Sequence, residues 1–116
     1  MKESNKEIVR GIMEKIRDII NDGDEGIYEN KVLINFSIEE LVKICYTEDD
    51  TFAKQAILKL LENKSKKVRF LAYYYLSVCR HRLEENIIYK LNDFMDNPDN
   101  SEIVRQASEQ YHVPLN

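Results

Sequence analysis

The sequence predicts an all-α fold of about three helical hairpins, forming a single domain over residues 1–116. Three observations predict it. Apolar residues recur at helical spacing along most of the chain, and helix-start signals precede several of these stretches. Only three glycines and two prolines occur, which argues against a sandwich or a barrel. No run of about 18 apolar residues is present, so no membrane span is expected.

The first helix is predicted over residues 5–21. Ser4 and Glu7 have the S-x-x-E spacing of a capping box, in which side chains satisfy the free backbone N–H groups of a first turn. An apolar stripe follows, made of Ile8, Val9, Ile12, Met13, Ile16, Ile19 and Ile20. Residues 22–26 end this helix. Residues 32–36 are expected to form a short extended segment or an apolar loop on the core.

Three further helices are predicted in the middle of the chain. Ser37 and Glu40 repeat the capping-box spacing and are expected to open a helix that runs through about Tyr46. Acids at 48–50 favour a new helix N-terminus, because they complement the helix dipole. The helix that follows ends near Leu61. Ser65 is expected to cap the next one.

The helix over residues 66–81 is the most apolar. One face holds Val68, Leu71, Ala72, Tyr75, Leu76 and Cys79, and a second face holds Phe70, Tyr74 and Val78. A helix with two apolar faces needs neighbours on both sides, so a central position is expected. The last helices are predicted at 84–95 and, capped by Ser101, at 101–111. A loop at 96–100 separates them, and Pro114 is expected to stop the last one.

An internal repeat relates the later helices. At a shift of 35 residues the matched pairs are Phe52 with Ile87, Ala53 with Ile88, Ala56 with Leu91 and Leu60 with Met95. At a shift of 36 they are Val68 with Val104, Arg69 with Arg105, Ala72 with Ser108 and Tyr75 with Tyr111. Hairpins that repeat in this way bury their apolar faces by stacking on one another.

Residues 65–76 read Ser-Lys-Lys-Val-Arg-Phe-Leu-Ala-Tyr-Tyr-Tyr-Leu and resemble the second helix of a HEAT-type repeat. Residues 101–111 repeat the Val-Arg pair at 104–105. The resemblance covers about residues 50–112 and implies a short HEAT-like α-α superhelix. A tetratricopeptide array has a similar period, but its Trp, Gly and Pro positions are missing. The first pair of helices departs from the pattern, so an irregular helical bundle is the alternative.

Motifs for catalysis and metal binding are missing from the sequence. It contains no Walker loop, G-x-G-x-x-G, H-E-x-x-H or G-x-S-x-G, and only two histidines, His81 and His112. Residues 22–26 fit a calcium loop only in part. We therefore expect no enzyme activity, no cofactor and no metal. Cys45 and Cys79 lie on apolar helical positions and are expected to be buried, reduced thiols.

Charge is unevenly distributed along the chain. The formal net charge is −4, whereas a generic nucleic-acid binder is usually basic. Residues 51–82 nevertheless carry eight basic side chains and one acidic one. Nucleic-acid binding by a HEAT-like protein through this basic middle is therefore kept as an alternative. Its candidate residues are Lys59, Lys64, Lys66, Lys67, Arg69, Arg80 and Arg82.

The leading prediction is a non-enzymatic protein-binding module. The turns that precede the first helices of successive pairs are expected to form an acidic ridge on one edge, made of Asp49, Asp50, Glu84 and Glu85. On the central helix, Arg69, Tyr73 and Arg80 fall together away from both apolar faces. Arg and Tyr are typical interface anchors. These seven residues are the predicted partner-binding set.

The narrower prediction is a small inhibitory protein. An acidic, helical chain without catalytic groups is similar to bacterial immunity proteins, which implies that it binds and neutralises a nuclease toxin. The acidic ridge would then occupy a basic cleft and speed association. A general scaffold or adaptor is a further alternative. The first seven residues contain no secretory h-region, so a cytoplasmic location is expected. The chain is expected to be a monomer or a weak dimer, with helix 5–21 and the tail 111–115 covering the ends of the stack.

Overall fold

The computed structural model describes the backbone of residues 2–113 and the side chains of residues 5–113. Seven α-helices make up the described part, and it contains no strand, which confirms the all-α prediction. They are α1 Lys2–Asn21, α2 Gly23–Glu29, α3 Lys31–Glu48, α4 Thr51–Leu61, α5 Lys66–Val78, α6 Glu85–Asp96 and α7 Ser101–Tyr111. Two 3₁₀ turns, η1 Arg80–Arg82 and η2 Pro98–Asn100, follow α5 and α6. None of the described helices combines the length and the apolar character needed to cross a bilayer.

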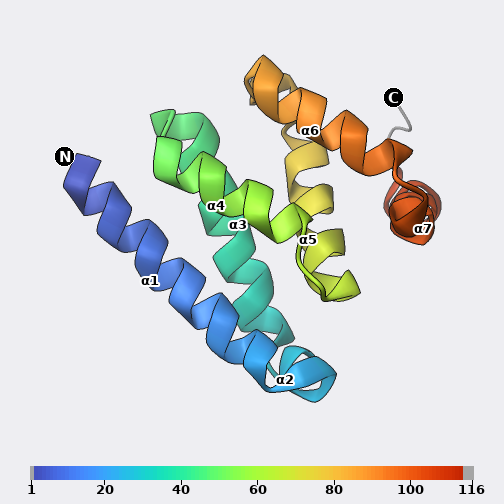
Figure 1. Ribbon diagram of the computed structural model, residues 1–116, viewed down its shortest axis with the longest axis horizontal. Helices are drawn as coiled ribbons and strands as arrows, with labels where there is room; N and C mark the ends of the chain where they lie inside the picture. The colour runs from blue at the N-terminus through green and yellow to red at the C-terminus, as the bar shows by residue number, and fades with distance from the viewer. Residues whose placement is uncertain (1, 114–116) are drawn as a thin grey trace.

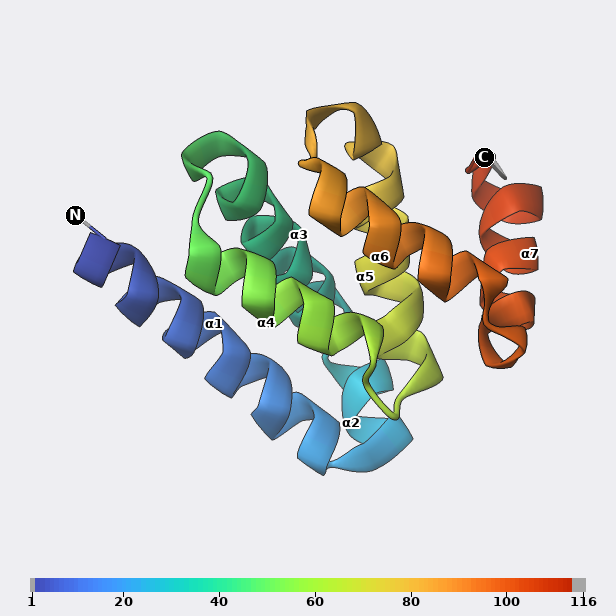
Figure 2. The same cartoon turned by 45° about the horizontal axis from the view of Figure 1, so that its top comes forward.

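The helices lie in two layers. In the first layer α4 lies between α1 and α6, and in the second α5 lies between α3 and α7 (Figures 1 and 2). The two layers pack on each other within the pairs α1 with α3, α4 with α5 and α6 with α7, and also between these pairs, through α3 with α4 and α5 with α6. The short helix α2 joins the ends of α1 and α3. The chain is therefore arranged as three successive helical pairs.

Helix α5 lies at the centre, as its two apolar faces predict. It contacts α3, α4, α6 and α7, and it buries Val68, Phe70, Leu71, Ala72, Tyr73 and Leu76. The second predicted face is covered only in part. Phe70 is buried and Tyr74 is half-buried, whereas Val78 is 58% exposed. The side of α5 that carries Val78 therefore lacks a covering helix within the described chain.

The prediction for residues 32–36 and the predicted helix start at Ser37 are wrong, whereas residues 38–46 are helical, as predicted. Residues 32–36 are neither extended nor a loop, because α3 begins at Lys31 and runs through them. Ser37 is buried in the middle of α3 and does not open a helix. The cause is the helical spacing of Ile34, Ile38 and Leu41, which are all fully buried and continue one apolar stripe through the expected boundary.

Two of the predicted helix starts carry a side-chain cap, whereas three predicted caps, the one at Ser37 included, are not where the sequence places them. The side chains of Asp50 and Ser65 accept hydrogen bonds from the backbone N–H groups of Ala53, at 2.9 Å, and Val68, at 3.4 Å. Helix α1 begins at Lys2, so the predicted cap position 4 lies inside it. Helix α7 begins at residue 101 itself, which therefore is not its cap. The prediction for position 114 lies outside the described residues.

Burial patterns align the second and third helical pairs at a shorter shift than the sequence predicts. The residues just before α4 and α6, Asp50 and Glu84, are 34 positions apart. The same shift of 34 matches buried residues with buried residues, namely Ala53 with Ile87, Ile57 with Leu91 and Leu60 with Phe94. From α5 to α7 the shift is 35, matching Val68 with Ile103 and Ala72 with Ala107.

The expected shifts of 35 and 36 are thus each one residue too long. These shifts pair apolar residues with apolar residues, but in some of the pairs one side chain is buried and the other is exposed. Phe52, for example, is 36% exposed, whereas its expected counterpart Ile87 is 1% exposed. The change from 34 to 35 coincides with η2, which lies between α6 and α7.

Candidate functional site

The predicted acidic ridge contains a cation. The Lys54 ammonium lies between the two turns, where it pairs with Asp49 and lies 3.0 Å from Glu84 Oε2. These two hydrogen bonds raise the pKa of Lys54. Asp50 is buried and holds the N-terminus of α4, so it is not available to a partner. Glu85 is exposed. The edge therefore presents three exposed acids with a lysine among them.

Tyr73 and Arg80 face α6 instead of solvent. Tyr73 is 1% exposed, and its ring stacks on Phe94 with 5.0 Å between the ring centroids. Arg80 Nη2 donates a hydrogen bond to Asn92 Oδ1 at 3.0 Å. Tyr73 therefore holds α5 against α6. The predicted helix over 66–81 ends at Val78, so the half-buried Arg80 lies in η1 and ties that turn to α6.

Arg69 ties three parts of the chain together. Its Nη1 donates to the backbone carbonyls of Asn63, at 2.8 Å, and Lys64, at 3.0 Å. Its Nε donates to Asn100 Oδ1 at 3.1 Å, in the turn before α7. The guanidinium therefore connects the turn that precedes α5 with the turn that precedes α7.

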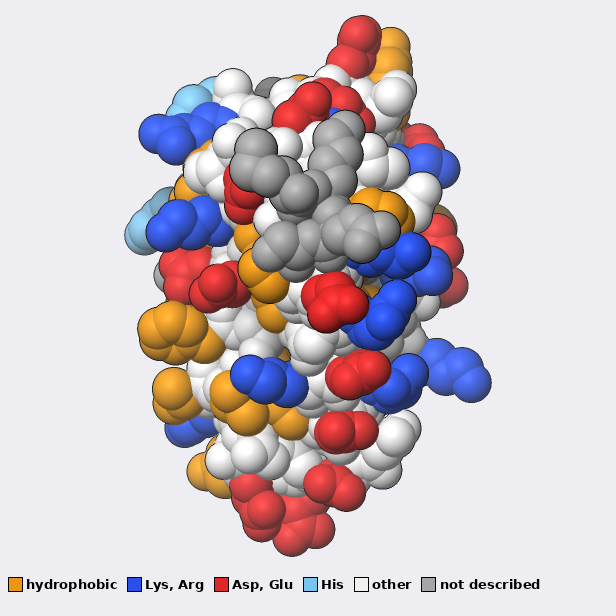
Figure 3. All heavy atoms as spheres, turned by 90° about the vertical axis from the view of Figure 1, so that its left-hand side faces the viewer, with side chains coloured by type: hydrophobic (Ala, Val, Ile, Leu, Met, Phe, Trp, Pro, Cys, Tyr) orange, Lys and Arg blue, Asp and Glu red, His pale blue; other side chains and the backbone are white. Residues whose placement is uncertain are grey.

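Exposed apolar side chains gather across α1, α3 and α5. The members of this apolar face are Ile8 (46% exposed), Val32 (70%), Leu33 (44%), Phe36 (65%) and Val78 (58%). Figure 3, which views the molecule from the left of Figure 1, shows hydrophobic side chains along one border and charges of both signs over the rest. Contiguous exposed apolar surface marks interaction sites in folded proteins. Sequence reasoning missed this face because it assigned residues 32–36 to the core.

Phe36 lies between two hollows of about 380 Å³ each. The first is between α1 and α3 and is lined by Ile8, Gly11, Ile12 and Leu33 together with Phe36. The second is between α3 and α5 and is lined in part by Tyr46, Tyr75 and Val78. A protruding side chain flanked by grooves is the surface relief on which helices pack, ridge into groove.

Gly11 keeps the first hollow open. It lies in the middle of α1, where glycine destabilises a helix by roughly 0.5–1 kcal/mol relative to alanine. The chain's own packing does not require it, since a Cβ at this position would meet no heavy atom within 4 Å. At Gly26, by contrast, a Cβ would lie 2.3 Å from Asp22 Cβ. The contacts within the chain therefore give a reason for glycine at position 26 but none for glycine at position 11.

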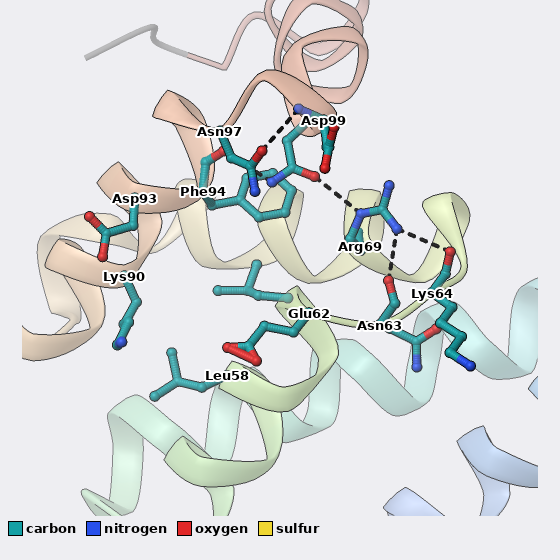
Figure 4. A pocket seen from close by; sticks show the side chains of 12 residues that line it. Leu58, Glu62, Asn63, Lys64, Arg69, Lys90, Asp93, Phe94, Asn97 and Asp99 are labelled. Atoms are coloured by element: carbon teal, nitrogen blue, oxygen red, sulfur yellow. Dashed lines mark hydrogen bonds between the residues drawn. The ribbon is translucent and has the colours of Figure 1, made fainter.

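A polar hollow of about 590 Å³ lies between the α4–α5 turn and the end of α6 (Figure 4). Its charged lining residues are Glu62, Lys64, Arg69, Lys90, Asp93 and Asp99, three of each sign. Arg69, at its edge, already donates hydrogen bonds to the surrounding turns. The balance of charges favours neither an anionic nor a cationic ligand here.

Cys45 and Cys79 are free thiols and both are buried, as predicted. Burial raises the pKa of Cys45 to about 12 and also raises the pKa of Cys79. A thiol held in its neutral form is a poor nucleophile. Among residues 5–113 there is no cluster of three or more His, Cys, Asp or Glu side chains placed to hold a metal ion.

The basic middle is divided between two kinds of residue. Arg69 and Arg80 donate hydrogen bonds within the fold, and the Arg82 guanidinium lies 5.2 Å from the centre of the Tyr46 ring. Arg82 is nevertheless exposed, and so are Lys59, Lys64, Lys66 and Lys67, of which Lys67 lies over the Phe70 ring. Five exposed cations are therefore left for the nucleic-acid alternative.

No protein-family model matches the chain, and no similar protein is found among the curated proteins or among the solved structures.

Proposed function

We propose that the chain is a non-enzymatic protein-binding module, built from stacked α-hairpins of the HEAT-like kind. The two-layer arrangement and the 34-residue match between α4 and α6 support the stacked-hairpin part of this proposal. The observation that carries the binding function is the apolar face around Phe36. Its five large apolar side chains are between 44% and 70% exposed, although they lie side by side around Phe36.

The apolar face supplies a driving force for association. Removing apolar surface from water stabilises a complex by roughly 25 cal/mol per Å², and large exposed side chains contribute most of that area. Leu33 and Phe36 are one helical turn apart on α3 and form the middle of the face. They are therefore the anchors that a partner would cover.

The test compares two glutamate substitutions at exposed apolar positions. Phe36→Glu changes the centre of the apolar face, and Tyr89→Glu changes a side chain on α6 that is 60% exposed and lies outside the face. Neither position is buried, so both variants are expected to keep the wild-type circular dichroism spectrum and urea midpoint.

The tagged chain is used to capture a partner, and the affinity of each variant for the purified partner is then measured. Phe36→Glu is expected to weaken binding by about 30-fold or more, the range of an interface hot spot. Tyr89→Glu is expected to bind like wild type. Equal binding by both variants would contradict the proposal.

The inhibitory role is the narrower form of this proposal. In this form Glu84 and Glu85, exposed at the start of α6 and beside Asp49, would meet a basic cleft of a nuclease toxin. Lys54 reduces the net charge of this edge. A Glu84→Lys, Glu85→Lys variant is expected to associate more slowly with a basic partner and with a weaker dependence on salt. An unchanged association rate would contradict the inhibitory role, and the broader protein-binding function would still stand.

A further inference from the structure

The apolar face presents a protrusion directly beside a depression. Phe36 is 65% exposed and borders the hollow between α1 and α3 that Gly11 lines. That hollow measures about 380 Å³, and a closed apolar cavity of roughly 150 Å³ already accommodates a benzene ring. The depression is therefore large enough to take an aromatic side chain like the one beside it.

The charges around the face are balanced. A third, shallower hollow beside Phe36 is lined by Lys31, Val32 and Tyr75 among others. The charged side chains that line the three hollows around Phe36 are Glu7, Lys15, Lys31, Glu39, Glu40 and Lys43, three of each sign. The whole chain, by contrast, carries a net charge of −4. Two copies of the chain that approach through this face meet without net repulsion, and acids of one copy can pair with lysines of the other.

We propose that this face docks a second copy of the chain as a two-fold symmetric dimer. The ring of Phe36 from each copy enters the hollow between α1 and α3 of the other copy and packs over Gly11. In a two-fold interface one patch meets itself, so a protrusion must lie beside a depression that it fits. The absent side chain of Gly11 leaves room for the incoming ring. The inference rests on the proposed function, because it names the occupant of the same apolar face.

The experiment measures the molecular mass of the full chain by sedimentation equilibrium, up to about 1 mM protein. The wild-type chain and Tyr89→Glu are expected to form dimers with the same dissociation constant. Phe36→Glu is expected to remain a monomer. A wild-type chain that remains a monomer up to that concentration would overturn the inference.

Gly11→Leu separates docking from folding. Leucine has a higher helix propensity than glycine, and a Cβ at this position meets no atom of the same chain, so the urea midpoint of the monomer is expected to rise. The leucine side chain takes the space over position 11 that the incoming Phe36 ring needs, so the dimer dissociation constant is expected to increase by at least about 30-fold. Gly11→Ala is expected to fall between wild type and Gly11→Leu. Undiminished dimerisation of Gly11→Leu would overturn the inference.

The two proposals fail separately. If the chain is a monomer and still binds a different protein in a way that Phe36→Glu abolishes, the dimer is wrong and the protein-binding function stands. If the chain neither dimerises nor binds a different protein through Phe36, both are wrong. If duplex DNA or RNA binds and Phe36→Glu has no effect on that binding, the nucleic-acid alternative replaces both.

Discussion

Asn63 and Asn97 make the same contact in successive helical pairs, 34 positions apart. The side-chain oxygen of Asn63 accepts a hydrogen bond from the backbone N–H of Ser65 at 2.8 Å, and that of Asn97 accepts one from Asp99 at 3.0 Å. Both asparagines lie where the first helix of a pair ends and the chain turns towards the second. Such a side-chain contact takes the place of a backbone hydrogen bond in a tight turn. The two turns are therefore built in the same way.

Equal destabilisation is expected when either asparagine is replaced by alanine. Asn63→Ala and Asn97→Ala each remove the acceptor of one turn N–H group and are expected to lower the free energy of unfolding by about 1 kcal/mol. Urea titration measures both. Asn86→Ala, at an exposed position on α6 with no side-chain hydrogen bond to any described residue, is the control and is expected to have little effect. A loss at only one of the two turns would show that they are not equivalent.

Tyr73→Phe is expected to leave stability unchanged or to raise it. The Tyr73 hydroxyl is buried and lies near the Ser77 side chain, but it makes no hydrogen bond of regular geometry to a described residue. A buried polar group without a partner costs about 1–3 kcal/mol, and phenylalanine removes the group while keeping the ring stacked on Phe94. Tyr73→Ala, which removes the ring as well, is expected to cost about 3–5 kcal/mol. Thermal or urea unfolding measures both changes, and a clear loss of stability in Tyr73→Phe would contradict this environment for the hydroxyl.

Arg69 and Asn100 are expected to be energetically coupled. Asn100 is buried, accepts from Arg69 Nε, and donates from its own Nδ2 to the Phe94 carbonyl at 3.1 Å. Arg69→Ala is expected to cost about 1.5–3 kcal/mol, because charged hydrogen bonds to three acceptors are lost. A double-mutant cycle with Asn100→Ala is expected to give a coupling energy of at least about 0.5 kcal/mol.

Arg105→Ala is the matched control for the Arg69 experiment. Arg105 pairs with Glu102 and Glu109, but its side chain is 57% exposed. Exposed ion pairs of this kind contribute little to stability, because water and salt screen them. A larger loss for Arg105→Ala than for Arg69→Ala would show that the bonds of Arg69 do not hold the turns together.

The sequence predicts helix boundaries well where local residues end one helix and cap the next. The starts of α4 and α5 are predictable because Asp50 caps α4 and Ser65 caps α5 through their own side chains. Residues 62–65 also interrupt the apolar stripe between the two helices. The prediction fails at Ser37, which has the spacing of a capping box but follows no interruption of the apolar stripe. There the burial of Ile34 and Ile38 against other helices decides the structure, and that information lies outside the local pattern.

The candidate site was less predictable than the helices. Periodicity shows which residues of a helix share a face, and Arg69 and Tyr73 do lie on the side of α5 near α6 and η2. Arg80 contacts α6 too, but from η1, beyond the end of α5. It does not show whether a neighbouring helix covers that face. The expected exposed anchors are covered by α6 and η2. Phe36, expected on the core, is exposed because no helix lies over that side of α3.

The buried thiols predict a loss of stability at alkaline pH. The pKa of Cys45 is about 12 in the fold, against about 8.5 for an exposed cysteine. The folded state therefore keeps a proton that the unfolded state releases. This contribution is fully present below pH 8.5 and decreases as the pH rises from about 8.5 towards 12. Cys79, whose pKa is also raised by burial, acts in the same direction.

Urea titrations at about pH 8 and pH 10 measure this effect, which is at most about 1.4 kcal/mol per pH unit for each thiol. A Cys45→Ala, Cys79→Ala variant is less stable at both pH values, because it leaves cavities, but its stability is expected to depend less on pH. A thiol-alkylating reagent at pH 8 gives an independent measurement, because both thiols are expected to react slowly in buffer and rapidly in urea. Cys45 reacting in buffer as fast as it does in urea would show that the thiol is not held neutral and buried between α3 and the end of α5.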